Sequence, residues 1–339
     1  MKALVTGATG FVGYHVAKAL QAKSIEVRAL VRAESDTNDL ARLDIELVTG
    51  DVRDYESVCR ALKGCTQLYH VAADYRLWVP DPRTMYEINV QGTVNVMEAA
   101  LKAGTEKIVY TSSAGTLVPK RRNGAVCSEN TPVDLSDMVG HYKKSKFLAE
   151  RQVSAFVGKG LPVVIVNPTT PVGPMDRKPT PTGKIIVDFL NGRMPAFIDT
   201  GLNFVDADEV GQGHWLAAQY GETGERYILG NRNMSLAEFL AVLARISNRK
   251  PPRVKLPYTP ILFAAYIDEA LSKWIRHAEP RIPLTGVRMA KSHMYFDCSK
   301  AVQGLGVPQT PVETAMEQAI EWYFQRGYVR NRCSGGADA

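Results

Sequence analysis

A chain of 339 residues is long enough for one large domain or two closely joined ones. Its hydrophobic fraction of 45% and charged fraction of 22% are typical of a soluble globular protein, and its formal charge of +6 is too weak and too spread out for a nucleic-acid-binding protein. No apolar run is long enough to span a bilayer, and the first residues lack the pattern of a signal peptide. The five cysteines are scattered without metal-ligand spacing, so we expect no metal site and reduced thiols in a cytoplasmic protein.

Short apolar runs alternate with helical patterns over the first 168 residues. The helical patterns include Val16 and Leu20, and later Val94, Met97 and Leu101, each set on one helix face. The apolar runs, which are typical of strands buried on both faces, cover residues 2–7, 26–32, 45–51, 67–73, 107–113 and 162–168. This alternation predicts an α/β fold with a doubly wound parallel sheet of the Rossmann type.

The sequence changes character after residue 168. Residues 168–184 contain five prolines, which predicts a long irregular surface loop, followed by a helix over 184–191. Further helices are predicted over 235–246, 260–275 and 311–326, and short strands over 225–230 and 294–298. We therefore predict a nucleotide-binding domain over 1–168, a smaller interleaved C-terminal substrate lobe over 169–330 with some segments returning to the first domain, and a disordered tail over 331–339.

Three glycines follow the first predicted strand and open the first predicted helix. Gly7, Gly10 and Gly13 have the spacing that permits a tight turn, a close approach of the backbone to a pyrophosphate, and close packing of helix on strand. The helix N-terminus then faces the anion. This segment predicts a dinucleotide cofactor.

The end of the second predicted strand bears on the choice between NADP and NAD. Arg32 at this end suits the extra phosphate of NADP, because a guanidinium matches phosphate geometry. Glu34 is the only nearby acid that could hold the ribose hydroxyl of NAD. The sequence favours NADP and leaves NAD open.

A tyrosine and a lysine one helical turn apart form a candidate acid–base pair. Tyr142 and Lys146 share a helix face, whereas Lys143 and Lys144 are predicted to point into solvent. A nearby ammonium lowers the pKa of a phenol, which then exchanges a proton with an alkoxide or carbonyl oxygen. Ser113, at the carboxyl end of a predicted strand, could donate a hydrogen bond to the same oxygen.

At this point the chain resembles the extended short-chain dehydrogenase/reductases over nearly its whole length. The resemblance rests on "TGATGFVG", "GDVRD", "YHVAA", "NVQGTVNV", "YTSSAG", "YKKSK", "NP" and "FVDADEV". Within that family, residues 70–82 and 179–203 look like those of hopanoid-associated sugar epimerases, and "TSSAGT" looks like dihydroflavonol reductases.

The resemblance implies a catalytic role for Ser113, Tyr142 and Lys146. It also implies that Asp51 and Val52 flank the adenine and that Ala72 lies along the cofactor. The full predicted cofactor site comprises Gly7, Thr9, Gly10, Phe11, Val12, Gly13, Arg32, Asp51, Val52, Ala72, Ala73, Tyr142, Lys146, Pro168, Thr169 and Thr170. We also expect a homodimer.

The substrate is expected to be a sugar or another hydroxylated ring. Tyr75, Arg76 and Trp78 in the loop after the fourth strand are candidate substrate contacts, because an aromatic beside an arginine suits such a ring; the same loop residues could instead serve packing. Asn167 is a further candidate. The helix over 259–275 is amphipathic, and we expect it to pack in the substrate lobe, without firm membrane contact; contact with a membrane surface is the alternative.

One departure from similar sugar-nucleotide epimerases concerns the residue that binds the substrate diphosphate. Those enzymes carry an arginine just before the relevant strand, where this chain has Gly201. Arg193, Arg288 or Lys291 could replace it. Three functions therefore remain: an epimerase with retained cofactor, an NADPH-dependent carbonyl reductase, and a cofactor-sensing protein without chemistry.

Overall fold

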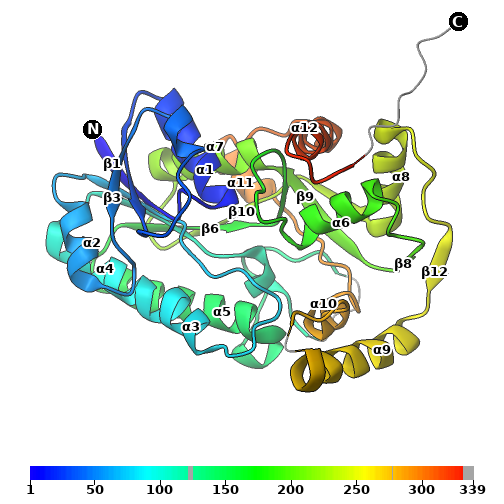
Figure 1. Ribbon diagram of the computed structural model, residues 1–339. Helices are drawn as coiled ribbons and strands as arrows, with labels where there is room; N and C mark the ends of the chain where they lie inside the picture. Colours follow the sequence, from blue (N-terminus) through cyan, green and yellow to red (C-terminus); the bar gives the residue numbers. More distant parts are fainter. Residues whose placement is uncertain (121–124, 277, 331–339) are drawn as a thin grey trace, which may run out of the picture.

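A computed structural model describes residues 1–120, 125–276 and 278–330, and a seven-stranded parallel sheet lies at its centre (Figure 1). The strand order is β10-β6-β5-β4-β1-β2-β3. The strands are β1 (Lys2–Thr6), β2 (Glu26–Val31), β3 (Ile45–Thr49), β4 (Gln67–His70), β5 (Lys107–Thr111), β6 (Val163–Pro168) and β10 (Arg226–Leu229). Every pairing in this sheet is parallel, which confirms the predicted fold class.

Helices cover both faces of this sheet, because successive residues of each buried strand point to opposite sides. Leu4 faces α2 (Tyr55–Leu62), α4 (Gly92–Ala103) and α5 (Gly140–Val157). Val5, its neighbour, faces α1 (Phe11–Ala22), α7 (Ala207–Tyr220) and α11 (Ser299–Leu305). The short α3 (Arg83–Tyr86) and a π turn (Glu87–Gln91) lead into α4, and 3-10 turns occur at Leu40–Arg42, Ala114–Leu117 and Leu135–Asp137.

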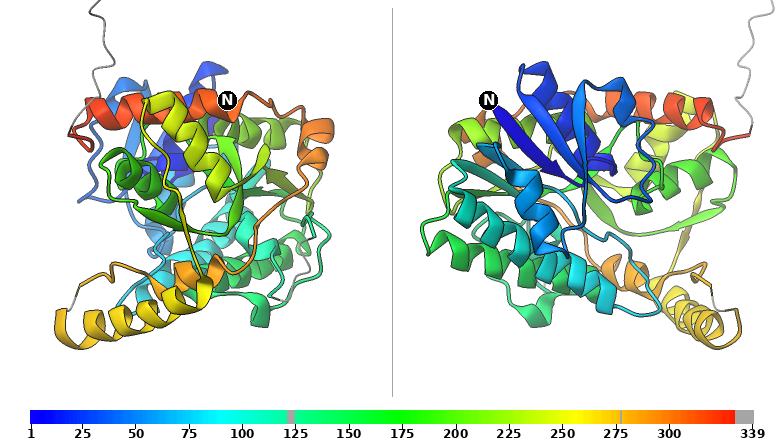
Figure 2. Two further views of the ribbon diagram at one scale, coloured as in Figure 1. Left: turned by 90° about the vertical axis from the view of Figure 1, so that its right-hand side faces the viewer. Right: turned by 60° about the vertical axis from the view of Figure 1, so that its left-hand side comes forward.

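A second lobe lies beside the carboxyl end of the sheet (Figure 2). Its three-stranded sheet, in the order β11-β9-β7, comprises β7 (Thr170–Val172), β9 (Gly201–Asp206) and β11 (Arg232–Ser235). The helices α6 (Pro181–Leu190), α8 (Leu236–Ser247) and α12 (Val312–Gln325) share its core, in which the rings of Phe204 and Phe239 stack with centroids 4.2 Å apart. A separate pair, β8 (Ala196–Ile198) with β12 (Val254–Leu256), leads to α9 (Tyr258–Leu271), a π turn (Ser272–Arg276) and α10 (Leu284–Met289).

The structure corrects several sequence-based boundaries. Residues 170–172 of the proline-rich segment form β7, because their partner β9 supplies the pairing that local sequence does not encode. The predicted strand over 294–298 is reduced to isolated bridges at Met294 and Phe296. Helix α6 begins at Pro181, a position that tolerates proline because its missing N–H has no partner there anyway.

Two predictions concern the C-terminal half of the chain. Strand β10 and helices α7 and α11 belong to the central layers although they follow residue 168. The predicted disordered tail, 331–339, lies outside the described residues. Among the residues that are described, no helix is both long and apolar enough to cross a bilayer.

Candidate functional site

The candidate site residues gather along one edge of the central sheet, because the carboxyl ends of parallel strands meet there. Gly7 follows β1, Arg32 follows β2, Asp51 follows β3 and Ala72 follows β4. Ser113 follows β5 in the same way. The segment Pro168–Thr170 leaves β6, and the Thr169 N–H donates to the Leu229 carbonyl at 3.0 Å, which ties that end of β6 to β10.

The glycine turn packs so tightly that side chains would not fit. Gly7 has φ +76°, and a Cβ there would lie 2.7 Å from the Ala72 backbone. A Cβ on Gly13 would lie 2.0 Å from the Gly7 carbonyl oxygen. Gly10 caps α1 without any side-chain hydrogen bond, and no acidic residue lies in the first turn, so no side chain caps the first N–H groups, which include those of Phe11 and Val12. The turn therefore fits a dinucleotide pyrophosphate.

The predicted adenosine end of the cofactor site carries two ion pairs. Arg32 Nε lies 3.3 Å from Glu34 Oε1, and both side chains are exposed. Asp51 accepts two hydrogen bonds from the Arg53 side chain, at 2.8 and 3.1 Å, and these lower the pKa of Asp51. Val52 is buried beside Gly92. Arg32 is thus available to an added phosphate, but Glu34 competes for it.

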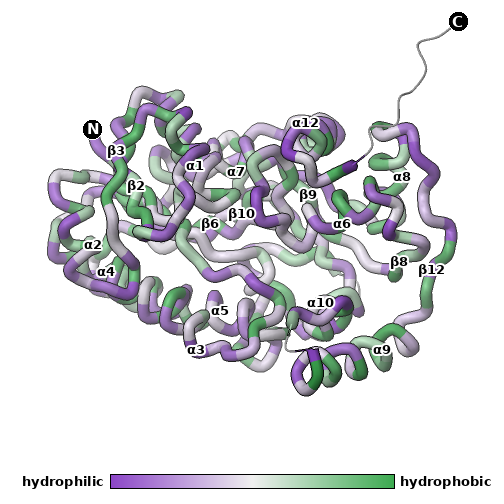
Figure 3. The backbone as a smooth tube through the Cα atoms, viewed as in Figure 1, coloured by the Kyte–Doolittle hydropathy of each residue, from purple (hydrophilic) through white to green (hydrophobic). Residues whose placement is uncertain are grey.

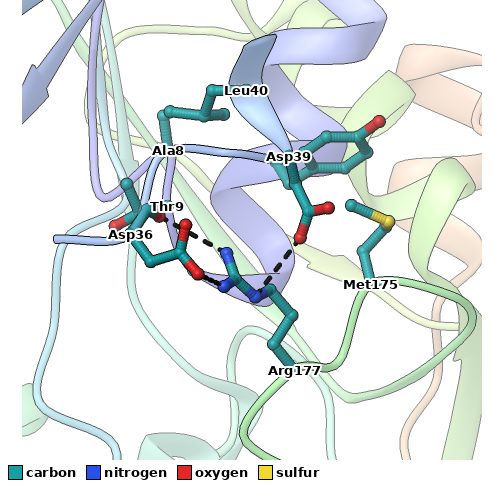
Figure 4. Close-up of a pocket in the computed structure, with 9 residues that line it drawn as sticks. Ala8, Thr9, Asp36, Asp39, Leu40, Met175 and Arg177 are labelled. Atoms are coloured by element: carbon teal, nitrogen blue, oxygen red, sulfur yellow. Dashed lines mark hydrogen bonds and ion pairs between the residues drawn. The ribbon is translucent and has the colours of Figure 1, made fainter. Parts of the chain in front are cut away.

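Arg177 was missed by sequence reasoning and lies directly beside the glycine turn (Figure 4). It extends from the proline-rich segment, forms an ion pair with Asp36, and places Nε 3.3 Å from Asp39 Oδ2. Together with Thr9 and Gly10 these residues line a small pocket. The only sequence signal for this cluster was a charged triplet, "DRK", inside a proline-rich loop.

The three predicted catalytic residues come together where β5 meets α5. The Ser113 hydroxyl accepts the Gly115 N–H at 3.1 Å, and its hydrogen bond with Tyr142 lowers the pKa of the phenol. Burial acts more strongly in the opposite direction and raises the pKa of Tyr142 to about 12. Lys146 is almost fully buried and donates to the Thr111 carbonyl at 2.6 Å.

This geometry corrects the expectation that Lys146 lowers the pKa of Tyr142. The Lys146 amine is directed at the Thr111 carbonyl and lies 4.5 Å from the centre of the Tyr110 ring. Burial lowers the pKa of Lys146 itself to about 7, with Glu150 opposing that shift. An amine that is only partly protonated at neutral pH exerts a weaker field than the full charge that the sequence argument assumed.

Glu150 is a second residue that the sequence reasoning missed. It is buried one further turn along the face of α5 that carries Tyr142 and Lys146, and that four-residue spacing was the available signal. Its carboxylate accepts hydrogen bonds from Ser112 and Asn167, the latter at 3.3 Å, and pairs with Arg226 Nε at 2.6 Å. Glu150 thus connects the carboxyl ends of β5 and β6 next to Ser113.

The predicted exposure of the neighbouring lysines is only half right. Lys144 is exposed, as predicted. Lys143 is buried, because the 3-10 turn after Ser113 and the segment around Met294 cover that side of α5. Its Nζ lies 3.5 Å from the Met294 sulfur.

The predicted substrate contacts separate into different environments. Tyr75 packs edge-on against Tyr142, with ring centroids 4.5 Å apart. Arg76 is exposed and pairs with Asp74, to which its Nε donates at 2.8 Å. Trp78 lies half-buried further along the same loop. Of these three residues, Tyr75 is the one that touches Tyr142, the candidate catalytic tyrosine.

The surroundings of Asn167 contradict its predicted role as a substrate contact. The side chain is fully buried, and Nδ2 donates to the Ser113 carbonyl at 3.1 Å. An amide in this position supports the strand end from below and is not exposed to a substrate. Its Oδ1 has no hydrogen-bond partner among the described residues.

Gly201, the departure noted in the sequence, is buried at the start of β9. A Cβ there would lie 2.5 Å from the Tyr295 hydroxyl and 2.6 Å from the His293 ring, so an arginine would not fit without rearrangement. Of the proposed replacements, Arg193 lies 3.6 Å from Asp188 and Arg288 donates to the Tyr266 hydroxyl on α9 at 2.7 Å. Both are thus engaged elsewhere, whereas Lys291 is exposed. Within the described part of the chain, no group of His, Cys, Asp or Glu side chains is placed to hold a metal ion.

Comparison with known proteins gives a consistent result. The family model described as the NAD dependent epimerase/dehydratase family matches residues 3–230. A putative dihydroflavonol 4-reductase of Synechocystis sp. is 42% identical, over 97% of this chain and 96% of its own length. Sterol demethylase protein B of Methylococcus capsulatus is 32% identical, over 97% and 100% respectively. The crystal structure of a nucleoside-diphosphate-sugar epimerase from Pseudomonas aeruginosa, 26% identical, matches 97% of this chain and 99% of its own, with a TM-score of 0.81.

These matches confirm several predictions made from the sequence. The predicted fold and family are correct, and the protein is an NAD(P)-dependent enzyme. The preference for NADP, the substrate, the roles of individual residues, the homodimer and the cytoplasmic location stay predictions.

Proposed function

Because the chain belongs to the NAD-dependent epimerase/dehydratase family, we propose that it is an NADPH-dependent reductase of a carbonyl group on a small molecule. The observation that carries this choice is the buried Gly201, which stands where similar sugar-nucleotide epimerases carry a diphosphate-binding arginine and where a side chain would first have to displace Tyr295 and His293. The name of the Synechocystis relative, a putative dihydroflavonol 4-reductase, supports the same choice.

The proposed mechanism assigns the proton to Tyr142. The substrate carbonyl oxygen would accept hydrogen bonds from the Ser113 and Tyr142 hydroxyls, which meet at the end of β5. The nicotinamide, when bound, supplies the hydride. As charge develops on the oxygen, Tyr142 gives up its phenolic proton and yields the alcohol. A phenol with a pKa of about 12 is protonated at neutral pH, which suits the donor that a reduction requires.

The remaining residues would bind and orient. The glycine turn and the N-terminus of α1 would hold the pyrophosphate, and Arg32 would hold the 2′-phosphate of NADP. Tyr75 would lie against one face of the substrate, since its ring already packs on Tyr142. Glu150 would keep the end of β5 in place beneath Ser113.

A second candidate is an epimerase that retains its cofactor, similar to the hopanoid-associated sugar epimerases. The P. aeruginosa protein named as a nucleoside-diphosphate-sugar epimerase supports this candidate at 26% identity. A cofactor-sensing protein without chemistry is a weaker third candidate, because Ser113, Tyr142 and Lys146 are all present.

Two measurements on the purified protein test these candidates. First, the nucleotide released on denaturation is identified by mass, and NADPH oxidation is followed with a dihydroflavonol and then with a nucleoside-diphosphate sugar. A reductase consumes one NADPH per dihydroflavonol reduced. Conversion of the sugar without net loss of NADPH would overturn the reductase and establish the epimerase.

The second measurement tests the cofactor preference. Arg32→Ala is expected to weaken NADPH binding at least ~10-fold, the size of a lost charge-assisted phosphate contact, and to leave NADH nearly unchanged. Arg60→Ala, an exposed arginine on α2, is the matched control. An equal loss for both cofactors would contradict the assignment of Arg32 to the 2′-phosphate.

A further inference from the structure

Helix α9 contradicts the expectation that it packs inside the substrate lobe. Of its residues only Ala265 is buried. Its inner side, Ile261, Leu262 and Ala265, packs against Leu284 and Val287 of α10. Its outer side is also apolar, and in Figures 1 and 2 the helix lies at the rim of the molecule, away from the central sheet.

The outer side forms a continuous apolar stripe, which we call the α9 face. Its members recur at intervals of three and four residues, with the last two in the π turn, so they share one side of the helix. They are Phe263, Tyr266, Ile267, Leu271, Trp274 and Ile275. Phe263 is 69% exposed, Trp274 74% and Ile275 69%. Figure 3 shows hydrophobic positions recurring along this helix.

Exposed apolar side chains concentrate in this region. Among the described residues, nine of the sixteen exposed large hydrophobic side chains lie between Val254 and Ile282. Scattered exposed hydrophobic residues are ordinary, whereas a contiguous group on one helix marks a binding surface.

The same region carries nearly all of the net charge of the protein, which corrects the expectation that this charge is spread along the chain. Residues 250–291 contain eight Lys and Arg against three Asp and Glu, a net charge of +5 out of +6 for the whole chain. Lys273, in the π turn that continues α9, and Arg281, just before α10, are exposed, and so is Arg253, which precedes β12. Large apolar side chains surrounded by cations match the border of an anionic bilayer, where the apolar groups enter the acyl region and the cations meet the headgroups.

We propose that the α9 face binds the surface of a membrane that contains anionic phospholipid. A second copy of this chain is a poorer occupant, because a symmetric contact would bring together two copies of a segment whose formal net charge is +5. The α9 face binds in the plane of the membrane, since none of the described helices is fit to span one. The proposal does not depend on the reaction that the enzyme performs.

Docking of this face would also orient the candidate active site. Thr285 on α10 lies close to Gly140: a Cβ added to Gly140 would lie 2.5 Å from the Thr285 methyl group. Gly140 is the first residue of α5 and comes two positions before Tyr142. Leu77 of the loop after β4 lies 3.7 Å from the Cβ position of Gly286 on α10. Helix α10 thus connects the α9 face to both α5 and the candidate substrate loop.

Sedimentation of the full-length protein with vesicles tests the proposal. The wild type is expected to sediment with vesicles of phosphatidylcholine mixed with phosphatidylglycerol, and much less with phosphatidylcholine alone. Phe263→Ser with Trp274→Ser is expected to weaken binding at least ~10-fold, because two large apolar side chains no longer enter the bilayer. Tyr220→Ser, which alters an exposed aromatic residue on α7, serves as the matched control and should bind normally.

A charge reversal gives an independent measurement. Lys273→Glu with Arg281→Glu should weaken binding to the anionic vesicles, whereas Lys102→Glu with Lys159→Glu, an equal change elsewhere, should not. Both sets are read together with the molecular mass in solution. Failure of the wild type to bind anionic vesicles, or equal binding by the Phe263/Trp274 variant, would overturn the proposal. A fall in molecular mass caused by that variant without any vesicle binding would instead identify a second copy as the occupant.

Discussion

At the scale of single residues, burial acts on Tyr142 and Lys146 in opposite directions. It raises the pKa of Tyr142 to about 12 and lowers that of Lys146 to about 7. In both cases burial favours the neutral form of the side chain, because a charge is poorly solvated inside the protein. The site in this state favours proton donation from a neutral phenol over proton removal by a phenolate.

Replacement of Tyr142 by phenylalanine tests this role. Tyr142→Phe removes the proton donor but keeps the ring against Tyr75, so turnover should fall ~100-fold or more while cofactor affinity stays close to wild type. Single-turnover rates and cofactor titration measure the two effects. Lys144→Ala, at an exposed position on the same helix, is the control and should be active. A Phe variant with near-normal turnover would remove Tyr142 from the chemistry.

The lowered pKa of Lys146 predicts a dependence of stability on pH. Between about pH 7 and the ordinary lysine value of 10.5, the unfolded chain holds a proton that the folded chain lacks. The free energy of unfolding therefore rises with pH in this window, by at most about 1.4 kcal/mol per pH unit from this residue. Below pH 7 the cost of the buried amine is fully present.

Lys146→Met removes that cost. The free energy of unfolding of the variant, relative to that of the wild type, should be highest near neutral pH. This difference in free energy should shrink as the pH rises. Urea unfolding of both proteins across the window measures it. The lost hydrogen bond to Thr111 adds a constant offset, so the slope and not the absolute difference is diagnostic. Lys144→Met should show no such slope, and a flat difference for Lys146→Met would contradict the lowered pKa.

At the scale of elements, the central sheet was predictable because its signal is local. Each strand is a short apolar run, and the positions that need glycine, such as Gly7 and Gly13, are visible in the sequence. Strand β7 was not predictable, since its three residues, one of which is Pro171, become a strand only by pairing with β9. The exposure of α9 was missed for a related reason: an apolar helix face has the same pattern whether or not another element covers it.

The candidate site shows the same division. The candidate catalytic trio and the glycine turn lie in short motifs, so their positions along the chain were visible in the sequence. Arg177 meets Asp36 and Asp39 across about 140 positions of the chain, and no spacing rule connects them. Lys143 was misjudged because the segment around Met294, distant in sequence, covers it.

The loop after β4 gives a prediction at this scale. Arg76 is exposed and Trp78 half-buried, whereas Met85 in the following helix is fully buried. If the loop binds substrate, Arg76→Ala and Trp78→Ala should raise KM or abolish turnover, while cofactor affinity and Tm stay near wild type. Steady-state kinetics and thermal unfolding measure these effects, with Arg83→Ala as an exposed control. A large fall in Tm for both variants with activity preserved would show that the loop serves packing.

At the scale of the whole molecule, an ionic cluster joins the two lobes next to the predicted cofactor site. Arg177 from the substrate lobe pairs with Asp36 and Asp39 from the loop after β2 (Figure 4). Arg326 at the end of α12 reaches the same Asp39 at 2.7 Å. Because the cluster borders Thr9 and Gly10, separation of the lobes there would open the side of the predicted pyrophosphate site.

Arg177→Gln should therefore act more on cofactor exchange than on stability. Its ion pairs are partly exposed and Arg326 still neutralises Asp39, so the loss of unfolding free energy should be about 1 kcal/mol or less. The dissociation rate of NADPH, measured by stopped-flow fluorescence, should rise several-fold, and the rise should diminish at high salt because screening already weakens the wild-type cluster. Arg232→Gln removes an ion pair with Glu313 within the substrate lobe and is the matched control. An unchanged dissociation rate in Arg177→Gln, together with a Tm loss equal to that of the control, would show that the cluster does not affect cofactor exchange and contributes only as ordinary surface ion pairs do.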